Sequence, residues 1–186
     1  MVPLSSLWMP VLLSAVLVFL ASSVIHMVLA VHKNDLKKVP DEDATQDAFR
    51  RLGITPGDYA VPCAGSSHDM KHPAFVERMA KGPVLFMTVL PGGQGFMGTS
   101  LALWFAYCIV VSVFGGYIGG RALAPGADYL DVFRFVGTVA FACYAMALPQ
   151  ASIWYKRNWG TTIRSMIDGL IYGSLTAGTF GWLWPR

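Results

Sequence analysis

Charged side chains are scarce in this sequence. Only 13% of the 186 residues are Asp, Glu, Lys or Arg, whereas soluble domains carry about 25%. The formal net charge of +3 is also too small to indicate a nucleic-acid partner. Hydrophobic residues make up 54% of the chain and the mean hydropathy is +0.49. The composition therefore predicts an integral membrane protein whose first partner is the lipid bilayer.

Cysteines and catalytic motifs are equally scarce. Cys63, Cys108 and Cys143 are too few and too scattered for a disulfide framework. The sequence has no nucleophile elbow, His-Glu-x-x-His, Walker loop, haem-attachment motif or dinucleotide fingerprint. It also has no inverted repeat of the kind found in many transporters. These absences remove the specific reasons to expect an enzyme, so the sequence favours a non-enzymatic role.

Four apolar segments are long enough to cross a bilayer, which takes about 20 residues of helix. We predict an all-α membrane protein with four transmembrane helices and a small cytoplasmic α or α+β insertion between the first two. Pro149 should kink the third helix or end its regular part. The predicted spans are residues 7–31, 99–120, 129–155 and 161–184, and the insertion is residues 32–98.

The insertion carries signals for short helices and a turn. Acidic residues after Pro40 and arginines before Gly53 predict one helix, and Pro73 fits the first position of a second. Residues 59–61 could form a short strand. The apolar segment 83–91 is bracketed by prolines and is too short for a helical span. It is open between a strand, an interfacial segment and a re-entrant element.

Lys and Arg predict the orientation, because cytoplasmic loops collect them. Of the 14 in the chain, only Arg121, Arg134 and Arg186 lie outside the insertion and the turn around 156–164. We therefore expect both termini to be extracytoplasmic and the insertion to be cytoplasmic.

Two stripes of small residues predict close helix packing, because such residues let helices approach in lipid. The stripes could pack against each other within one chain or against another chain. The second use favours a structural or accessory subunit that forms a homo-oligomer or joins a larger membrane complex. The stripes consist of Gly115, Gly116, Gly119 and Gly120 in the second span, and of Gly169, Gly173, Ala177 and Gly181 in the fourth.

The first candidate site is the loop with Cys63, His68, Asp69 and His72. Thiolate, imidazole and carboxylate are ligands of zinc or copper, so a bound metal is one hypothesis for a cofactor. The spacing matches no common zinc finger, however, and a second cysteine is missing. The alternative is a polar loop in which His72 caps the following helix.

The second candidate site is polar and intramembrane. His26 lies in the first span and Asp168 in the fourth, and ionisable groups in lipid are costly and often functional. Arg164 precedes Asp168 by one helical turn, so the two could neutralise each other. His26 and Asp168 could instead line a cytoplasm-facing cavity or touch each other. A structural hydrogen bond between helices is the alternative to a metal- or small-ligand-binding site.

The sequence resembles a family of small, uncharacterised bacterial four-span membrane proteins. The resemblance rests on His26-Met27, residues 39–43, the turn at 57–59 and the closing stretch 168–184. It implies the bacterial inner (cytoplasmic) membrane and carries no activity, ligand or catalytic residue.

Overall fold

The computed structural model describes residues 1–93 and 96–186 and divides the chain into two compact units. The first, here called the helical unit, comprises Met1–Leu36 and Gly95–Arg186. The second, here called the insertion unit, is Lys37–Gln94. The expected insertion, residues 32–98, thus starts a few residues later, and its positions 94 and 95 lie outside the described residues.

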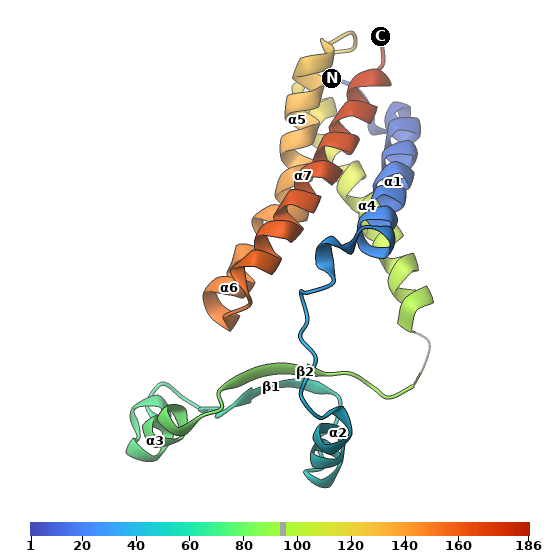
Figure 1. Cartoon of the computed structure of the whole chain (residues 1–186). Helices are drawn as coiled ribbons and strands as arrows, with labels where there is room; N and C mark the ends of the chain where they lie inside the picture. Colours follow the sequence, from blue (N-terminus) through green and yellow to red (C-terminus); the bar gives the residue numbers. More distant parts are fainter. Residues whose placement is uncertain (94–95) are drawn as a thin grey trace. The chain divides into compact units, whose positions relative to one another are not determined.

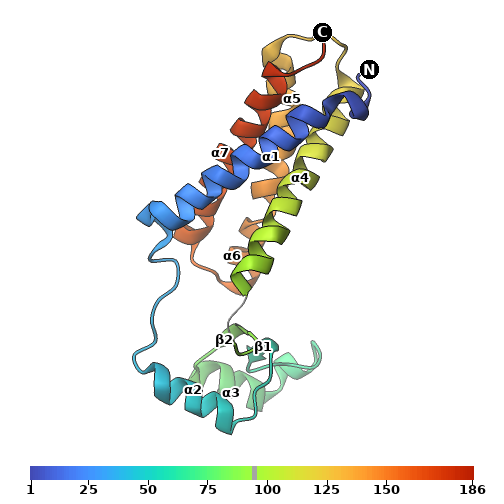
Figure 2. The ribbon, with the colours of Figure 1, turned by 90° about the vertical axis from the view of Figure 1, so that its right-hand side faces the viewer.

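The helical unit begins with a 3-10 turn, η1 (Leu4–Leu7), which leads into α1 (Trp8–Ser23) and a π-helical turn, η2 (Val24–Val28). A second 3-10 turn, η3 (Ala30–His32), follows. The remaining helices are α4 (Phe96–Ala122), α5 (Tyr129–Phe141), the π-helical turn η5 (Ala142–Met146), α6 (Pro149–Tyr155) and α7 (Trp159–Trp182). They lie alongside one another in Figures 1 and 2.

Two interruptions in these helices have a local cause. Leu29 takes an extended backbone conformation, with φ −85° and ψ 128°, so the first helix ends at Val28 instead of running to residue 31. Pro149 is the first residue of α6, and η5 lies just before it. Because proline has no N–H and clashes with the preceding turn, the third helical segment is broken there, as the sequence predicts.

Among the residues that the structure describes, three helices are long and apolar enough to cross a membrane: Leu4–Val28, Met97–Ala122 and Tyr129–Tyr155. Helix α7 is long but less apolar. Its buried face consists largely of small and hydroxyl-bearing residues, including Gly169, Gly173, Thr176 and Ala177. Such residues lower the hydropathy of α7 while they allow close packing against other helices.

The glycine stripes pack inside the helical unit and mainly against one common partner, α5 with η5. A Cβ on Gly169 would lie 2.8 Å from the Ala145 Cβ, and one on Gly119 would lie 2.9 Å from a methyl group of Val136. Helix α7 contacts α1 and α5, and α4 contacts the same two helices. The stripe of α7 and two glycines of α4, Gly115 and Gly119, therefore approach the same helix, whereas Gly116 faces Phe180 of α7 and Gly120 faces Val2.

The insertion unit is α+β. It consists of α2 (Glu42–Arg51), β1 (Gly57–Val61), the 3-10 turn η4 (Asp69–Lys71), α3 (Pro73–Lys81) and β2 (Leu85–Val89). The strands pair antiparallel, from Gly57 opposite Val89 to Val61 opposite Leu85. The segment 83–91 therefore supplies an edge of a small sheet, which was one of its three predicted forms.

Candidate ligand and metal site

Three ionisable side chains meet where α1 gives way to its following loop. His26 comes from η2, His32 from η3 and Asp168 from α7. The Oδ2 atom of Asp168 is 2.8 Å from His32 Nε2 and 3.9 Å from His26 Nε2. One potential ligand atom from each residue lies within 4.8 Å of the other two. We call these three residues the His-His-Asp cluster.

The backbone breaks described above create this cluster. On an uninterrupted helix, positions 26 and 32 would point to different faces. The π-turn, the extended Leu29 and the 3-10 turn instead bring the two imidazole rings to a centroid distance of 4.5 Å. Since π-turns often occur at functional sites, the break itself marks this end of α1 as a candidate site.

A second carboxylate, that of Asp35, contacts the His32 ring nitrogen that faces away from Asp168. The Nδ1 atom of His32 is 2.7 Å from Oδ2 of Asp35. The other carboxylate oxygen of Asp35 accepts hydrogen bonds from Arg164 Nε at 3.0 Å and from the Thr161 hydroxyl at 3.3 Å. The hydrogen bond to His32, helped by Arg164 and opposed by burial, lowers the pKa of Asp35 to about 2.

Asp168 is the buried acid of the cluster, at 6% exposure. Its ion-pair contacts in the described part of the chain are both with imidazoles. The predicted neutralisation by Arg164 does not occur, because Arg164 pairs with Asp35. The reason is directional: helical side chains lean toward the N-terminus, so Arg164 extends away from Asp168 and toward the start of α7. The contact between His26 and Asp168, the other predicted arrangement, is present.

The cluster borders a cleft of about 640 Å³. Both π-turns contribute to its wall, η2 through His26 and η5 through Tyr144. Its lining includes the ionisable His26 and Asp168 and the hydroxyl of Ser165, and most of the other lining residues are aromatic or apolar. The remaining lining residues are Ser22, Ser23, Met27, Met97, Leu101, Trp104, Tyr107, Cys143, Tyr144, Ala147, Leu148 and Tyr172.

Buried polar atoms in and beside this cleft lack hydrogen-bond partners. Tyr172 is 4% exposed, and its hydroxyl makes no hydrogen bond within the described residues. Tyr144 is 8% exposed, and its hydroxyl likewise makes no hydrogen bond within the described residues. His32 Nε2, although close to Asp168, is not in hydrogen-bond geometry with it. Because buried polar groups are normally satisfied, these atoms are available to hydrogen-bond with a water molecule or a ligand.

The loop candidate of the insertion unit is arranged differently. His72 precedes α3 and its Nδ1 accepts a hydrogen bond of 3.3 Å from the Ala74 N–H, which is the predicted capping role. Cys63 is exposed, and its thiol faces the Ala64 carbonyl at 3.8 Å. Within residues 1–93 and 96–186, Cys63, His68, Asp69 and His72 do not gather into a group of three potential ligands.

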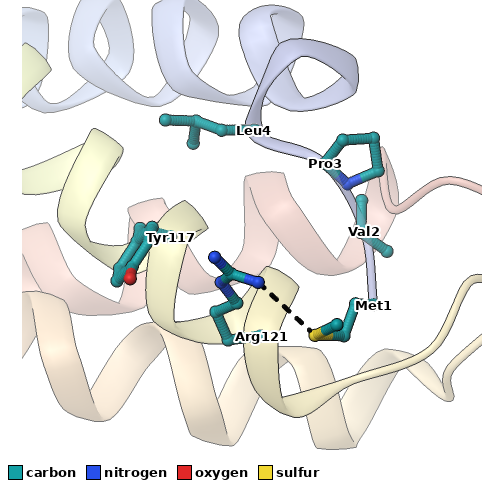
Figure 3. A pocket seen from close by; sticks show the side chains of 6 residues that line it. All are labelled: Met1, Val2, Pro3, Leu4, Tyr117 and Arg121. Carbon is teal, nitrogen blue, oxygen red and sulfur yellow. Dashed lines mark hydrogen bonds between the residues drawn. The ribbon is translucent and has the colours of Figure 1, made fainter.

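A smaller cleft of about 340 Å³ lies where Met1–Leu4 meet the end of α4 (Figure 3). The Arg121 guanidinium donates to the Met1 sulfur at 3.6 Å and lies 5.6 Å from the centre of the Tyr117 ring. The residues that line this cleft include no histidine, cysteine or carboxylate, and its polar side-chain groups are the Met1 thioether, the Tyr117 hydroxyl and the Arg121 guanidinium. We therefore assign no site to it.

Sequence reasoning missed His32 and Asp35. A weak signal was present: a second histidine and an acid directly follow the first apolar run. Regular helical geometry gave no reason to connect them with His26 or Asp168, because the link depends on Leu29 leaving the helix.

The fold and this geometry define a mostly helical protein that has three helices apolar enough to cross a membrane, with a His-His-Asp cluster at the edge of a cleft. None of the family models, curated proteins or solved structures compared with this chain matches it.

Proposed function

We propose that this chain is a multi-pass membrane protein that binds a small amphipathic molecule in the cleft beside the His-His-Asp cluster. The observation that carries the proposal is that one cleft combines a largely aromatic and apolar lining, two buried tyrosine hydroxyls without hydrogen-bond partners among the described residues, and the ionisable side chains of His26 and Asp168. Ligand sites generally combine a mostly apolar wall with a few converging polar groups.

Four crossings of a bacterial inner membrane form the setting of this proposal. Helix α7 is as long as a span and is packed against α1 and α5, and its lower hydropathy is explained by its glycines and threonines. The bias of Lys and Arg supports extracytoplasmic termini and a cytoplasmic insertion unit. The cleft would then open near the cytoplasmic edge of the bilayer.

The topology is tested by thiol labelling. Cys63 is exposed in the insertion unit, whereas Cys108 is buried. In a Cys143→Ala background, a membrane-impermeant maleimide should label inverted vesicles and leave right-side-out vesicles unlabelled. Labelling of Cys63 in right-side-out vesicles alone would reverse the proposed orientation.

The binding function is tested by native mass spectrometry of the full chain released from lipid nanodiscs. We expect a bound small molecule on the wild type and on Ala142→Trp, but not on Ala147→Trp. Ala147 lines the cleft, whereas Ala142 is exposed on η5 and does not line it. Retention of the same bound mass by Ala147→Trp, or its absence from the wild type, would contradict binding in this cleft.

The alternative function is that of an accessory or self-associating subunit. The glycine stripes were the main reason to expect it, and most of them contact helices of the same chain. The apolar surface of the helical unit faces lipid equally well in either case. A companion protein that copurifies in a fixed ratio would favour this alternative over the binding function.

A further inference from the structure

We infer that the His-His-Asp cluster binds one divalent transition-metal ion through His26 Nε2, His32 Nε2 and a carboxylate oxygen of Asp168. The inference rests on the proposed function in one respect: the metal faces the same cleft and would hold the polar head of the bound molecule. The metal itself requires only the three side chains and their immediate supports.

The separations of the ligand atoms suit a metal of this size. With metal–ligand distances of about 2.0–2.2 Å, two ligands of a tetrahedral ion are about 3.3 Å apart. The measured distances from Asp168 Oδ2, 2.8 Å to His32 and 3.9 Å to His26, lie on either side of this value. The side chain of His26 is 50% exposed, so its ring has room to rotate toward the other two ligands.

The hydrogen-bond partners of His32 match those that usually orient a metal-binding histidine. Such a histidine nearly always donates its second ring N–H to a carboxylate or carbonyl, which fixes the tautomer and aims the free nitrogen at the metal. Asp35 takes this position, 2.7 Å from His32 Nδ1, and is itself held by Arg164 and Thr161. His32 Nε2, which faces Asp168 without a hydrogen bond, is the nitrogen left for the metal.

The distribution of charge in the site also favours a bound cation. Asp35 and Asp168 supply two carboxylates, and the permanent cation next to them, Arg164, is directed at Asp35. Asp168, although it is the more buried acid, has only imidazoles as charge partners in the described chain. A buried carboxylate without a matching charge is costly, and a divalent ion bound to it removes that cost.

The donor set selects the class of metal and leaves one position open. Two imidazole nitrogens and one carboxylate oxygen suit zinc and its neighbours in the first transition row, whereas calcium and magnesium prefer oxygen donors alone. A site with three protein ligands keeps a fourth position for water or a bound molecule. Because His26 and Asp168 both line the cleft, that position faces it. The ligand class is therefore an amphipathic molecule with a metal-binding head.

The test is titration of the full-length, chelator-treated protein in detergent with Co²⁺ alone, followed by visible absorption and metal analysis. We expect one ion per chain. His26→Ala and Asp168→Asn should each lower the affinity at least about 100-fold, beyond the usual effect of a supporting residue. His26→Ala should fold normally, because the side chain is half exposed. Cys63→Ser and His72→Ala serve as matched controls from the insertion unit and should bind like the wild type.

Two results would overturn the inference: absence of a stoichiometric ion on the wild type, or wild-type affinity in both His26→Ala and Asp168→Asn. Loss of the ion in Cys63→Ser would move the site to the insertion unit. The proposed function fails separately. If Ala147→Trp keeps its bound small molecule while the metal data hold, the metal site stands and the cleft proposal falls. The reverse pattern removes the metal and keeps the cleft.

Discussion

The four histidines of this chain occur in two pairs, and the structure places the two pairs in different environments. His68 and His72 are one helical turn apart, next to Cys63 and Asp69, and look like a metal-binding motif in the sequence. His26 and His32 have a spacing that places them on different faces of a regular helix. In the structure the first pair lies in exposed loop and capping positions, whereas the second pair converges on the buried Asp168.

The difference lies in burial and in the backbone, and not in the residue types. His72 starts α3 from an extended conformation, so it never shares a helix with His68, and both are solvated. Asp168 is 6% exposed, and a buried carboxylate must be compensated by nearby groups. The chain supplies them by breaking the helix at Leu29 and folding His32 back. Burial of one acid is therefore the reason for proposing His26 and His32, rather than His68 and His72, as metal ligands.

The strongest way to break the comparison is to disturb the packing beside Asp168 without changing a ligand. Gly169→Leu should destabilise the helical unit by about 1–3 kcal/mol or more, because the new side chain enters a tightly packed contact. A Cβ there would be 2.8 Å from that of Ala145, whereas one on the control Gly98 would meet no described atom within 4 Å. Thermal unfolding of Gly169→Leu and Gly98→Leu measures the difference. Equal stability of the two would show that α7 does not depend on this contact.

The second prediction compares the two acids that accompany the histidine pairs. Zn²⁺ at 100 times its dissociation constant should stabilise the wild type by about 2.7 kcal/mol. Asp168→Asn should lose nearly all of this stabilisation, because it removes the charged ligand. Asp69→Asn, the equivalent change in the insertion unit, should keep it. Thermal unfolding with and without Zn²⁺ decides, and a full zinc effect in Asp168→Asn would be inconsistent with the assigned ligand.

The third prediction sharpens the role of the group behind His32. Asp35→Asn should weaken metal binding about 10- to 100-fold, since an amide orients the imidazole less firmly than a carboxylate does. Asp47→Asn is the control, because Asp47 also pairs with an arginine, Arg50, but on an exposed helix. Competition with a chelating dye measures both affinities. Unchanged affinity in Asp35→Asn would mean that Asp35 only anchors the loop.

The smallest expected effect concerns the pair His68 and His72. His72→Ala should lower the stability of α3 by at most about 1 kcal/mol, the usual scale for losing an N-cap, and His72→Ser should restore it. Hydrogen exchange of the amides in Pro73–Lys81 is the measurement. A change in metal affinity in His72→Ala would instead assign this histidine to a metal site.

Much of the helical unit was predictable, because long apolar runs predict membrane-spanning helices. The break at Pro149 and the cap at His72 followed from known local preferences. The ion pair between Arg164 and Asp35 was not predictable, because the chain brings Asp35 to Arg164 only by turning back at Leu29, after the helix ends. The same turn of the chain places His32 beside Asp168, so the role of His32 was not predictable either. His26 and Asp168, by contrast, were recognisable as ionisable groups in apolar runs. Sequence periodicity predicts regular helices and strands, whereas His26 and His32 lie in the irregular segment that follows α1.

The central claim, that the His-His-Asp cluster is the metal site, is tested most directly by X-ray absorption of the full chain loaded with one equivalent of Zn²⁺. We expect only nitrogen and oxygen ligands at about 2.0–2.2 Å, with the signature of two imidazoles. A sulfur ligand at about 2.3 Å would contradict it, because the cluster contains no cysteine, and would place the metal at Cys63 or another thiol.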